Sequence, residues 1–230
     1  MQVIETETPS SKAGMYLKNW VGQHQGTTLC FIAGGSALEI IKGLNMSEEY
    51  KRRTIFMMGD ERWSREPEEN NYLQLLELFD GDTQDYKFIS TELAPREDVK
   101  DFSKRLTGTA ENIFLKPNVQ VITILGIGED GHTASIFPMS EDQFKKTYGR
   151  DSTYLHTYVK GLKNEHRASL SPAFIKNRTN HIIAYATGKN KKEILNALVN
   201  ETKPLHEMPS QLIKDHQSAV LITDQDIKVG

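Results

Sequence analysis

Short apolar segments alternate with longer helical segments along this chain, and that alternation restricts it to few folds. The segment Val121–Leu125 is apolar at almost every position, as in strands that are covered by helices on both faces. Strands that alternate with helices indicate an α/β fold with a mostly parallel sheet flanked by helices. In such sheets ligands bind beyond the carboxyl ends of the strands, so the residues that follow each strand are the first candidates for function.

The pattern predicts a single domain over residues 1–230. Strands are predicted at Thr28–Ala33, Thr54–Met58, Tyr86–Ile89, Val119–Leu125, Ala168–Leu170, Ile182–Ala186 and Ala219–Thr223. Helices are predicted at Lys12–Gln23, Ala37–Leu44, Asn71–Phe79, Arg96–Leu115, Lys189–Asn200 and Ser210–His216. The polar segment 138–164 is the least regular, and we expect a small irregular excursion from the sheet there.

Composition and charge narrow the possible partners. The formal net charge of −3 makes nucleic acid or an anionic membrane an unexpected partner, so an anionic ligand needs a local cluster of positive groups. The one cysteine, Cys30, cannot form an internal disulfide, which fits a cytoplasmic location. The N-terminus does not resemble a signal peptide, and no apolar run is long enough to span a bilayer. We expect a monomer or a small homo-oligomer.

The first predicted strand is followed by Gly34-Gly35-Ser36 and then by a helical segment. Glycines allow close approach of a ligand to the backbone, and the N-terminus of a helix offers free N–H groups to an anion. These three residues therefore predict a phosphate-binding loop. A tight strand-to-helix turn with Ser36 as the N-cap explains the same pattern.

The second predicted strand is followed by Asp60-Glu61-Arg62. A carboxylate beside an arginine can bind hydroxyl groups, orient a base or hold an anion. A solvated loop is the alternative interpretation.

A glycine-rich segment, Gly126 to His132, follows the fourth predicted strand. Its G-x-G-x-x-G spacing matches the dinucleotide fingerprint, but Pro138 would end the long helix that such a fingerprint requires. The loop instead presents Asp130, Gly131 and His132 above the sheet. Histidine is the usual general base near neutral pH, an acidic neighbour can fix its tautomer, and loop N–H groups can stabilise an oxyanion. A structural histidine in a turn is the alternative.

Other kinds of catalytic centre find no support in the sequence. The remaining histidines have no spacing typical of a metal site, and no Gly-x-Ser-x-Gly elbow is present, so we expect neither a metal nor a cofactor. Basic residues near predicted strand ends, Arg167 and Lys191, could complete a phosphate site. For Lys191 and its neighbours Lys189 and Lys192, a solvated helix face is the alternative.

Taken together, these motifs resemble those of 6-phosphogluconolactonases. The stretch from Ile124 to Pro138 is similar to the signature of that family, and Asp60-Glu61-Arg62 with Asn71-Tyr72 is similar to its second motif. Further similar positions are Gly34-Gly35-Ser36, Arg167, Ser169-Leu170, Gly188 and Lys191. The resemblance runs from about residue 28 to 223 and implies a Rossmann-like fold of the sugar-phosphate isomerase type.

Glucosamine-6-phosphate deaminases are related to this family, and two positions distinguish the chain from them. Phe137 stands where the deaminases carry a glutamate, and Arg62 stands where they carry a tyrosine. The chain also departs from the lactonase pattern, with Ala37-Leu38 in place of Thr-Pro after the glycine loop and Asn70 in place of serine.

The resemblance implies a hydrolase that acts on a small-molecule sugar phosphate, 6-phospho-D-glucono-1,5-lactone, in the pentose phosphate pathway. His132 would activate a water molecule, Asp130 would orient His132, and loop N–H groups together with Arg62 would meet the oxyanion. The phosphate and the sugar would be held by Gly34, Gly35, Ser36, Asp60, Gly131, Arg167 and Lys191. Two alternatives stay open: a deaminase or isomerase that uses Asp60 as the carbon base, and a sugar-phosphate sensor without catalytic activity.

Overall fold

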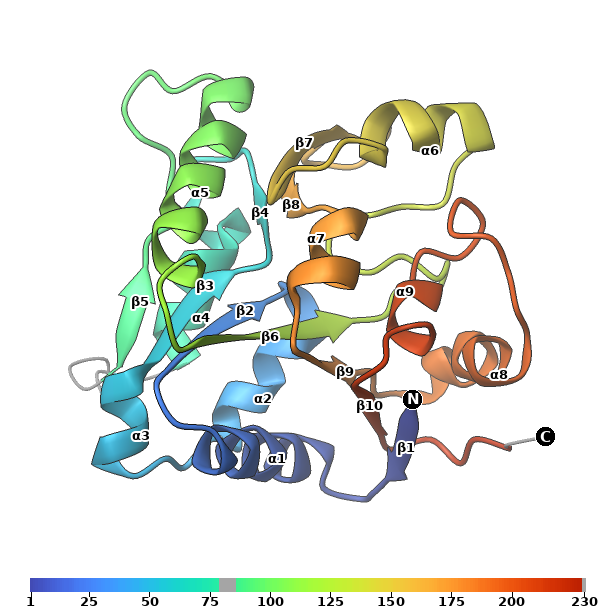
Figure 1. Cartoon of the computed structure of the whole chain (residues 1–230). Helices are drawn as coiled ribbons and strands as arrows, with labels where there is room; N and C mark the ends of the chain where they lie inside the picture. Colours follow the sequence, from blue (N-terminus) through green and yellow to red (C-terminus); the bar gives the residue numbers. More distant parts are fainter. Residues whose placement is uncertain (79–85, 229–230) are drawn as a thin grey trace.

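A seven-stranded parallel sheet forms the centre of the protein, as a computed structural model that describes residues 1–78 and 86–228 shows (Figure 1). Every pairing between neighbouring strands of this sheet is parallel, so the predicted fold class is confirmed. In spatial order the strands are β1 (Gln2–Glu5), β10 (Ala219–Thr223), β9 (His181–Tyr185), β6 (Val119–Gly126), β2 (Thr27–Ile32), β3 (Thr54–Met58) and β5 (Lys87–Ile89).

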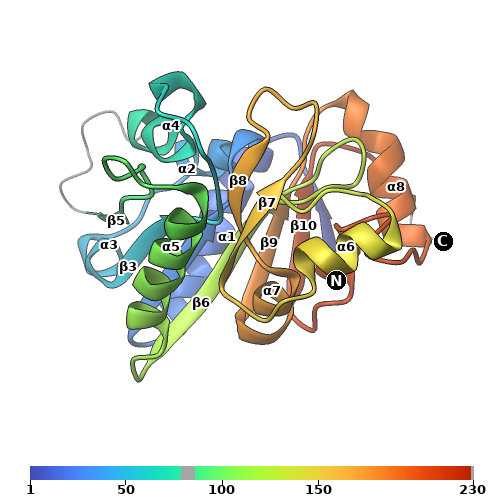
Figure 2. The same cartoon turned by 90° about the horizontal axis from the view of Figure 1, so that it is seen from above.

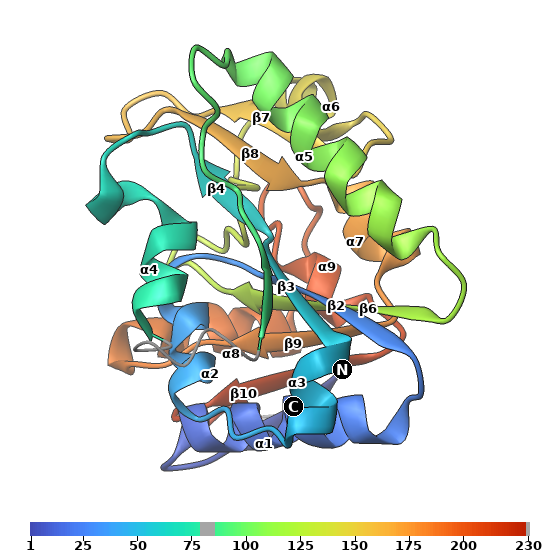
Figure 3. The ribbon, with the colours of Figure 1, turned by 90° about the vertical axis from the view of Figure 1, so that its left-hand side faces the viewer.

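Helices cover both faces of this sheet. Figure 3 shows α1 below it, with α5 and α7 on the opposite side. The helices are α1 (Pro9–Gln23), α2 (Glu39–Lys42), α3 (Glu48–Arg53), α4 (Asn71–Leu78), α5 (Val99–Phe114), α6 (Glu141–Tyr148), α7 (Pro172–Arg178), α8 (Lys192–Asn200) and α9 (Gln211–Lys214). Short 3₁₀ helices at Gly35–Leu38 and Lys189–Lys191 lead into α2 and α8. Phe79, the last residue of one predicted helix, lies outside the described residues.

The central strand β6 is buried on both faces of the sheet. Four of its side chains, Val121, Ile122, Ile124 and Leu125, are buried although consecutive residues point to opposite faces. A strand that is apolar on both faces needs cover on both faces, and the helices supply it.

A second, smaller sheet lies on the α5 side of the first. It is antiparallel, in the order β4 (Asp60–Arg62), β8 (His166–Leu170) and β7 (Tyr154–Tyr158). Seen from above, its strands run between α5 and α6 (Figure 2). The predicted strand Ala168–Leu170 therefore belongs to this sheet and not to the parallel one. The interpretation of Asp60–Arg62 as a loop is also wrong, because the chain continues from β3 through Gly59 directly into β4.

The expected irregular excursion near 138–164 is wrong in part, since the segment contains α6 and β7. Helix α6 buries only Phe144 and Tyr148, and its other positions are polar, which hides the helical periodicity. Strand β7 forms by pairing with β8, and the local sequence does not predict this contact.

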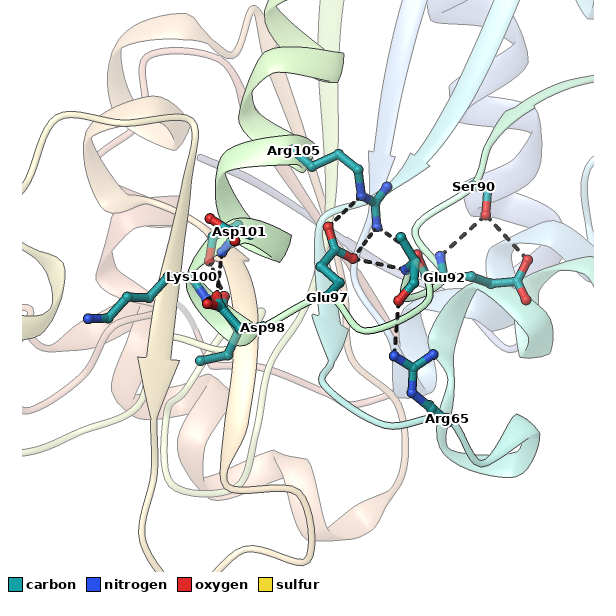
Figure 4. Close-up of polar contacts among 11 residues, drawn as sticks. Arg65, Ser90, Glu92, Glu97, Asp98, Lys100, Asp101 and Arg105 are labelled. Atoms are coloured by element: carbon teal, nitrogen blue, oxygen red, sulfur yellow. Dashed lines mark hydrogen bonds and ion pairs between the residues drawn. The ribbon is translucent and has the colours of Figure 1, made fainter.

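The connection from β5 to α5 is held by side chains (Figure 4). The guanidinium of Arg105 donates to both carboxylate oxygens of Glu97, at 2.8 and 3.0 Å. The Asp98 carboxylate accepts from the N–H groups of Lys100 and Asp101, and so caps the first turn of α5. These contacts fix the start of α5 relative to the connection that precedes it.

Candidate active site

The strand order brings the predicted site residues to one edge of the sheet. Strands β9, β6, β2 and β3 are consecutive neighbours, so the loops that follow their carboxyl ends lie side by side. A cleft of about 240 Å³ opens between these loops. It is lined by Ala33, Gly34, Gly35, Ser36, Gly126, Ile127, Gly128, His132, Ala134 and Lys191.

His132 and Asp130 form a hydrogen-bonded pair at this cleft. Nδ1 of His132 lies 2.5 Å from Oδ1 of Asp130, and the same oxygen accepts from the backbone N–H of His132 at 3.1 Å. A carboxylate can only accept, so Nδ1 carries the proton and Nε2 of the neutral ring keeps its lone pair. Burial by itself raises the pKa of Asp130, but the bonds to His132 outweigh it and the net pKa is lowered. Asp130 is therefore an anion that fixes the tautomer of His132.

Gly128 lets the imidazole take this position. A Cβ at residue 128 would lie 2.1 Å from Nδ1 of His132 and 2.7 Å from Oδ1 of Asp130, far inside normal contact distances. The loop is closed by backbone bonds from Gly128 N–H to the His132 carbonyl at 2.8 Å and from Gly131 N–H to the Gly128 carbonyl at 3.0 Å. These two N–H groups are used within the loop, so other donors would have to meet an oxyanion.

The loop after β2 turns at Gly35, whose φ of +69° is unfavourable for other residues. The Asp60 side chain holds this loop in place through a hydrogen bond. Its Oδ1 accepts from the Gly34 N–H at 2.9 Å, and its Oδ2 accepts from the Ser135 hydroxyl at 2.7 Å. Asp60 is only 4% exposed, so its carboxylate joins the glycine loop to the turn that follows His132.

Glu61 lies completely buried behind the site. Its carboxylate accepts from the backbone N–H groups of Arg62, Asn71 and Tyr72 and from the Thr91 hydroxyl. Burial raises the pKa of Glu61 to about 7, and these four donors oppose that rise. The contact ties β4 to the first turn of α4, where a negative charge is favourable.

Arg62 and Arg167 lie directly opposite each other in the β4–β8 pairing. Nη1 of Arg62 donates to the carbonyl of Glu69 at 3.0 Å, and Nε of Arg167 donates to the carbonyl of Asn164 at 3.0 Å. Nε of Arg62 is buried and has no hydrogen-bond partner among the described residues. Burial lowers the pKa of Arg167, and Arg62 adds to that effect. Two like charges at opposite positions repel, so the arrangement favours a bound anion.

The Phe137 ring contacts both Arg167 and His132. The guanidinium of Arg167 lies 5.5 Å from the centre of the Phe137 ring, and the His132 ring lies 4.5 Å from the same ring centre. The Phe137 N–H donates to the Tyr148 hydroxyl at 3.0 Å. The sequence does not indicate a role for Phe137, Tyr148 or Ser135, because their contacts with the site depend on tertiary structure.

The departures from the lactonase pattern have structural explanations. Asn70 Oδ1 accepts from the N–H of Leu73 at 3.0 Å, as a serine N-cap would. Ala37 and Leu38 are buried in the core beneath the glycine loop.

Residues 1–78 and 86–228 contain no group of three or more histidine, cysteine, aspartate or glutamate side chains placed to hold a metal ion. Among the same residues, no helix has the length and apolar character that crossing a membrane requires.

The fold is that of a parallel α/β protein with a cleft at the carboxyl edge of its sheet, lined by the glycine loop, His132 and Lys191. The family model described as glucosamine-6-phosphate isomerases/6-phosphogluconolactonase matches residues 12–222. The chain therefore belongs to this family.

Individual relatives agree with that assignment. A curated 6-phosphogluconolactonase of Borreliella burgdorferi is 24% identical over 204 residues, which cover 84% of this chain and 82% of the relative. One from Chlamydia pneumoniae is 25% identical over 209 residues, covering 86% of this chain and 77% of the relative.

Solved structures establish the fold. A 6-phosphogluconolactonase from Shewanella baltica is similar with a TM-score of 0.76 at 19% identity, covering 96% of this chain and 95% of the other. The enzyme from Trypanosoma brucei is similar with a TM-score of 0.73 at 22% identity and the same coverage.

Proposed function

We propose that this protein hydrolyses 6-phospho-D-glucono-1,5-lactone to 6-phospho-D-gluconate, with His132 as the general base. The observation that carries the proposal is the His132–Asp130 pair, which lies in one cleft with the glycine loop and Lys191. The curated relatives named above carry this activity in their names.

The reaction uses the free lone pair of His132. Nε2 removes a proton from water, and the resulting hydroxide attacks the ring carbonyl carbon of the lactone. The imidazolium that forms is stabilised by the Asp130 anion. It then returns the proton to the ring oxygen as the carbon–oxygen bond breaks. General base catalysis of this kind contributes roughly 10²–10⁴-fold.

The phosphate end is held by positive groups around the glycine loop. Gly35, Ser36 and Lys191 line the cleft, and Arg167 stands beside the ring that contacts His132. The position of Arg62 opposite Arg167 favours a role on the phosphate over one on the oxyanion. Binding of the phosphate orients the distant carbonyl toward His132.

The deaminase or isomerase alternative requires Asp60 to remove a proton from carbon. Asp60 is 4% exposed, and both of its oxygens accept hydrogen bonds from the protein. Phe137 occupies the position where the deaminases carry a glutamate, and its ring lies against His132. Both observations favour the lactonase. Incubation with glucosamine 6-phosphate and an ammonia assay checks the alternative directly.

The test compares enzyme-dependent lactone hydrolysis for the wild type, His132→Asn and the control His206→Asn, after spontaneous opening of the lactone is subtracted. We expect His132→Asn to lose kcat by about 10²-fold or more, with a small change in KM. His206 does not line the cleft, and its variant should keep the wild-type rate. A His132→Asn rate within about threefold of the wild type would show that His132 is not the base. Binding of the sugar phosphate without turnover by the wild type would instead support the sensor alternative.

A further inference from the structure

Two backbone carbonyls orient the arginine pair, and they come from segments far apart in the chain. The carbonyl that accepts from Arg62 belongs to Glu69, at the end of the 3₁₀ helix Pro67–Glu69. The carbonyl that accepts from Arg167 belongs to Asn164, in the connection between β7 and β8. Both acceptors are neutral carbonyls, so neither of these hydrogen bonds pairs a guanidinium with a carboxylate.

The same two residues are joined by their side chains. The Asn164 amide donates to Oε2 of Glu69, and the Lys163 ammonium forms an ion pair with Oε1. These contacts lower the pKa of Glu69, with Lys163 as the larger cause and Asn164 the smaller. The Glu69 side chain is only 9% exposed, whereas that of Lys163 is 82% exposed. The Glu69 carboxylate thus bridges the two segments whose carbonyls hold the arginines.

This bridge addresses a physical difficulty of the site. Repulsion between Arg62 and Arg167 tends to separate the two side chains, and a long arginine side chain loses conformational entropy when it is held in one place. A direct ion pair with a carboxylate would orient an arginine but would also neutralise it. The Glu69 carboxylate instead forms its ion pair with Lys163, and the hydrogen bonds that the arginines donate go to backbone carbonyls.

We propose that Glu69, through its hydrogen bond to Asn164, is a positioning residue that holds Arg62 and Arg167 at the separation needed to bind the substrate phosphate. This inference rests on the proposed function, because it takes the phosphate of the sugar as the ligand of the arginine pair. The role of Glu69 is indirect: it contacts neither the ligand nor the reacting atoms.

The experiment measures kcat and KM for the phosphorylated lactone and for unphosphorylated glucono-1,5-lactone. The variants are Glu69→Ala, Glu69→Gln and Asn164→Ala. Glu68→Ala is the matched control, since Glu68 is an exposed neighbour in the same short helix and lies outside these hydrogen bonds. Dissociation constants for 6-phosphogluconate and inorganic phosphate are measured by calorimetry, and folding is checked by circular dichroism.

For Glu69→Ala and Asn164→Ala we expect KM for the phosphorylated lactone, and both dissociation constants, to rise about tenfold, which corresponds to the loss of roughly one hydrogen bond to a charged group. The kcat value should change by less than about threefold, and KM for the unphosphorylated lactone should not change. Glu69→Gln keeps an oxygen that can accept from Asn164 and should recover most of the binding. Glu68→Ala should match the wild type.

The inference is overturned if folded Glu69→Ala binds the phosphorylated ligands within about twofold of the wild type. It is also overturned if KM rises equally for the phosphorylated and the unphosphorylated lactone. If Glu69→Ala does not fold, the same criteria apply to Asn164→Ala, which retains the backbone carbonyl that holds Arg167. Failure of the proposed function looks different. A wild type that binds phosphate but hydrolyses no lactone refutes that function, and a weaker phosphate affinity in Glu69→Ala would then still support the positioning role.

Discussion

Replacing Gly128 with alanine should disrupt the His132–Asp130 pair without disturbing the fold. The new Cβ would lie 2.1 Å from Nδ1 of His132 and 2.2 Å from its Cε1. Ordinary contacts between such atoms are about 3.5–4 Å, so the ring must move by more than about 1 Å. Gly128 is not among the glycines with positive φ, so an alanine backbone can adopt its conformation and the effect comes from the contact alone.

A displacement of about 1 Å at a catalytic group can cost about 10²-fold in rate, which is about 2.7 kcal/mol of transition-state stabilisation. We expect kcat of Gly128→Ala to fall by this factor. The KM value should stay within about threefold, because the proposed phosphate site at Gly35 and Lys191 does not involve His132. The assay is lactone hydrolysis followed by proton release, corrected for the spontaneous reaction.

Gly108→Ala is the matched control. Gly108 lies within α5, and a Cβ there would have no atom within 4 Å. Because glycine is unfavourable in a helix, this variant should gain about 0.5–1 kcal/mol of stability and keep full activity. If folded Gly128→Ala hydrolyses the lactone within about threefold of the wild-type rate, the reasoning that joins the His132 position to catalysis is refuted.

Three further predictions concern specificity, pH and reactivity. Arg167→Ala should lower kcat/KM for the phosphorylated lactone by about one to two decades and leave the unphosphorylated lactone unaffected, and equal turnover of both lactones by the wild type would contradict this. Burial, with His216 and His24 adding to it, lowers the pKa of His181 from its ordinary value of 6.5 to about 4. Because the unfolded chain binds this proton more tightly, stability is present above about pH 6.5 and is lost as pH falls toward 4, by about 2 kcal/mol between pH 7 and pH 5. Urea titrations at about pH 7 and pH 5 should show that His181→Phe loses less folding stability over this range than the wild type. Burial raises the pKa of the Cys30 thiol, so a thiol reagent should label it only when urea unfolds the protein, and rapid labelling of the native protein would contradict its burial.

The sequence by itself determined the α/β class and indicated the loop in which Asp130 and His132 form a pair. Val121–Leu125 is apolar on both faces, and such a strand is stable only inside a sheet covered on both sides. Asp130 and His132 are two residues apart in one loop, so their contact depends on local geometry that the sequence can indicate. The glycine loop follows the neighbouring strand, and the parallel arrangement places both loops at the same edge.

Only the tertiary structure decided how the polar residues divide into those that face the cleft and those that support it. Strand β4 is three polar residues long and has no periodicity of its own, so its pairing with β8 could not be predicted. Asp60 and Ser135 are 75 residues apart, and Glu69 and Asn164 are 95 apart, yet both pairs are in contact. Such contacts depend on the register and packing of distant segments, which are set when the whole core is buried and not by any local pattern.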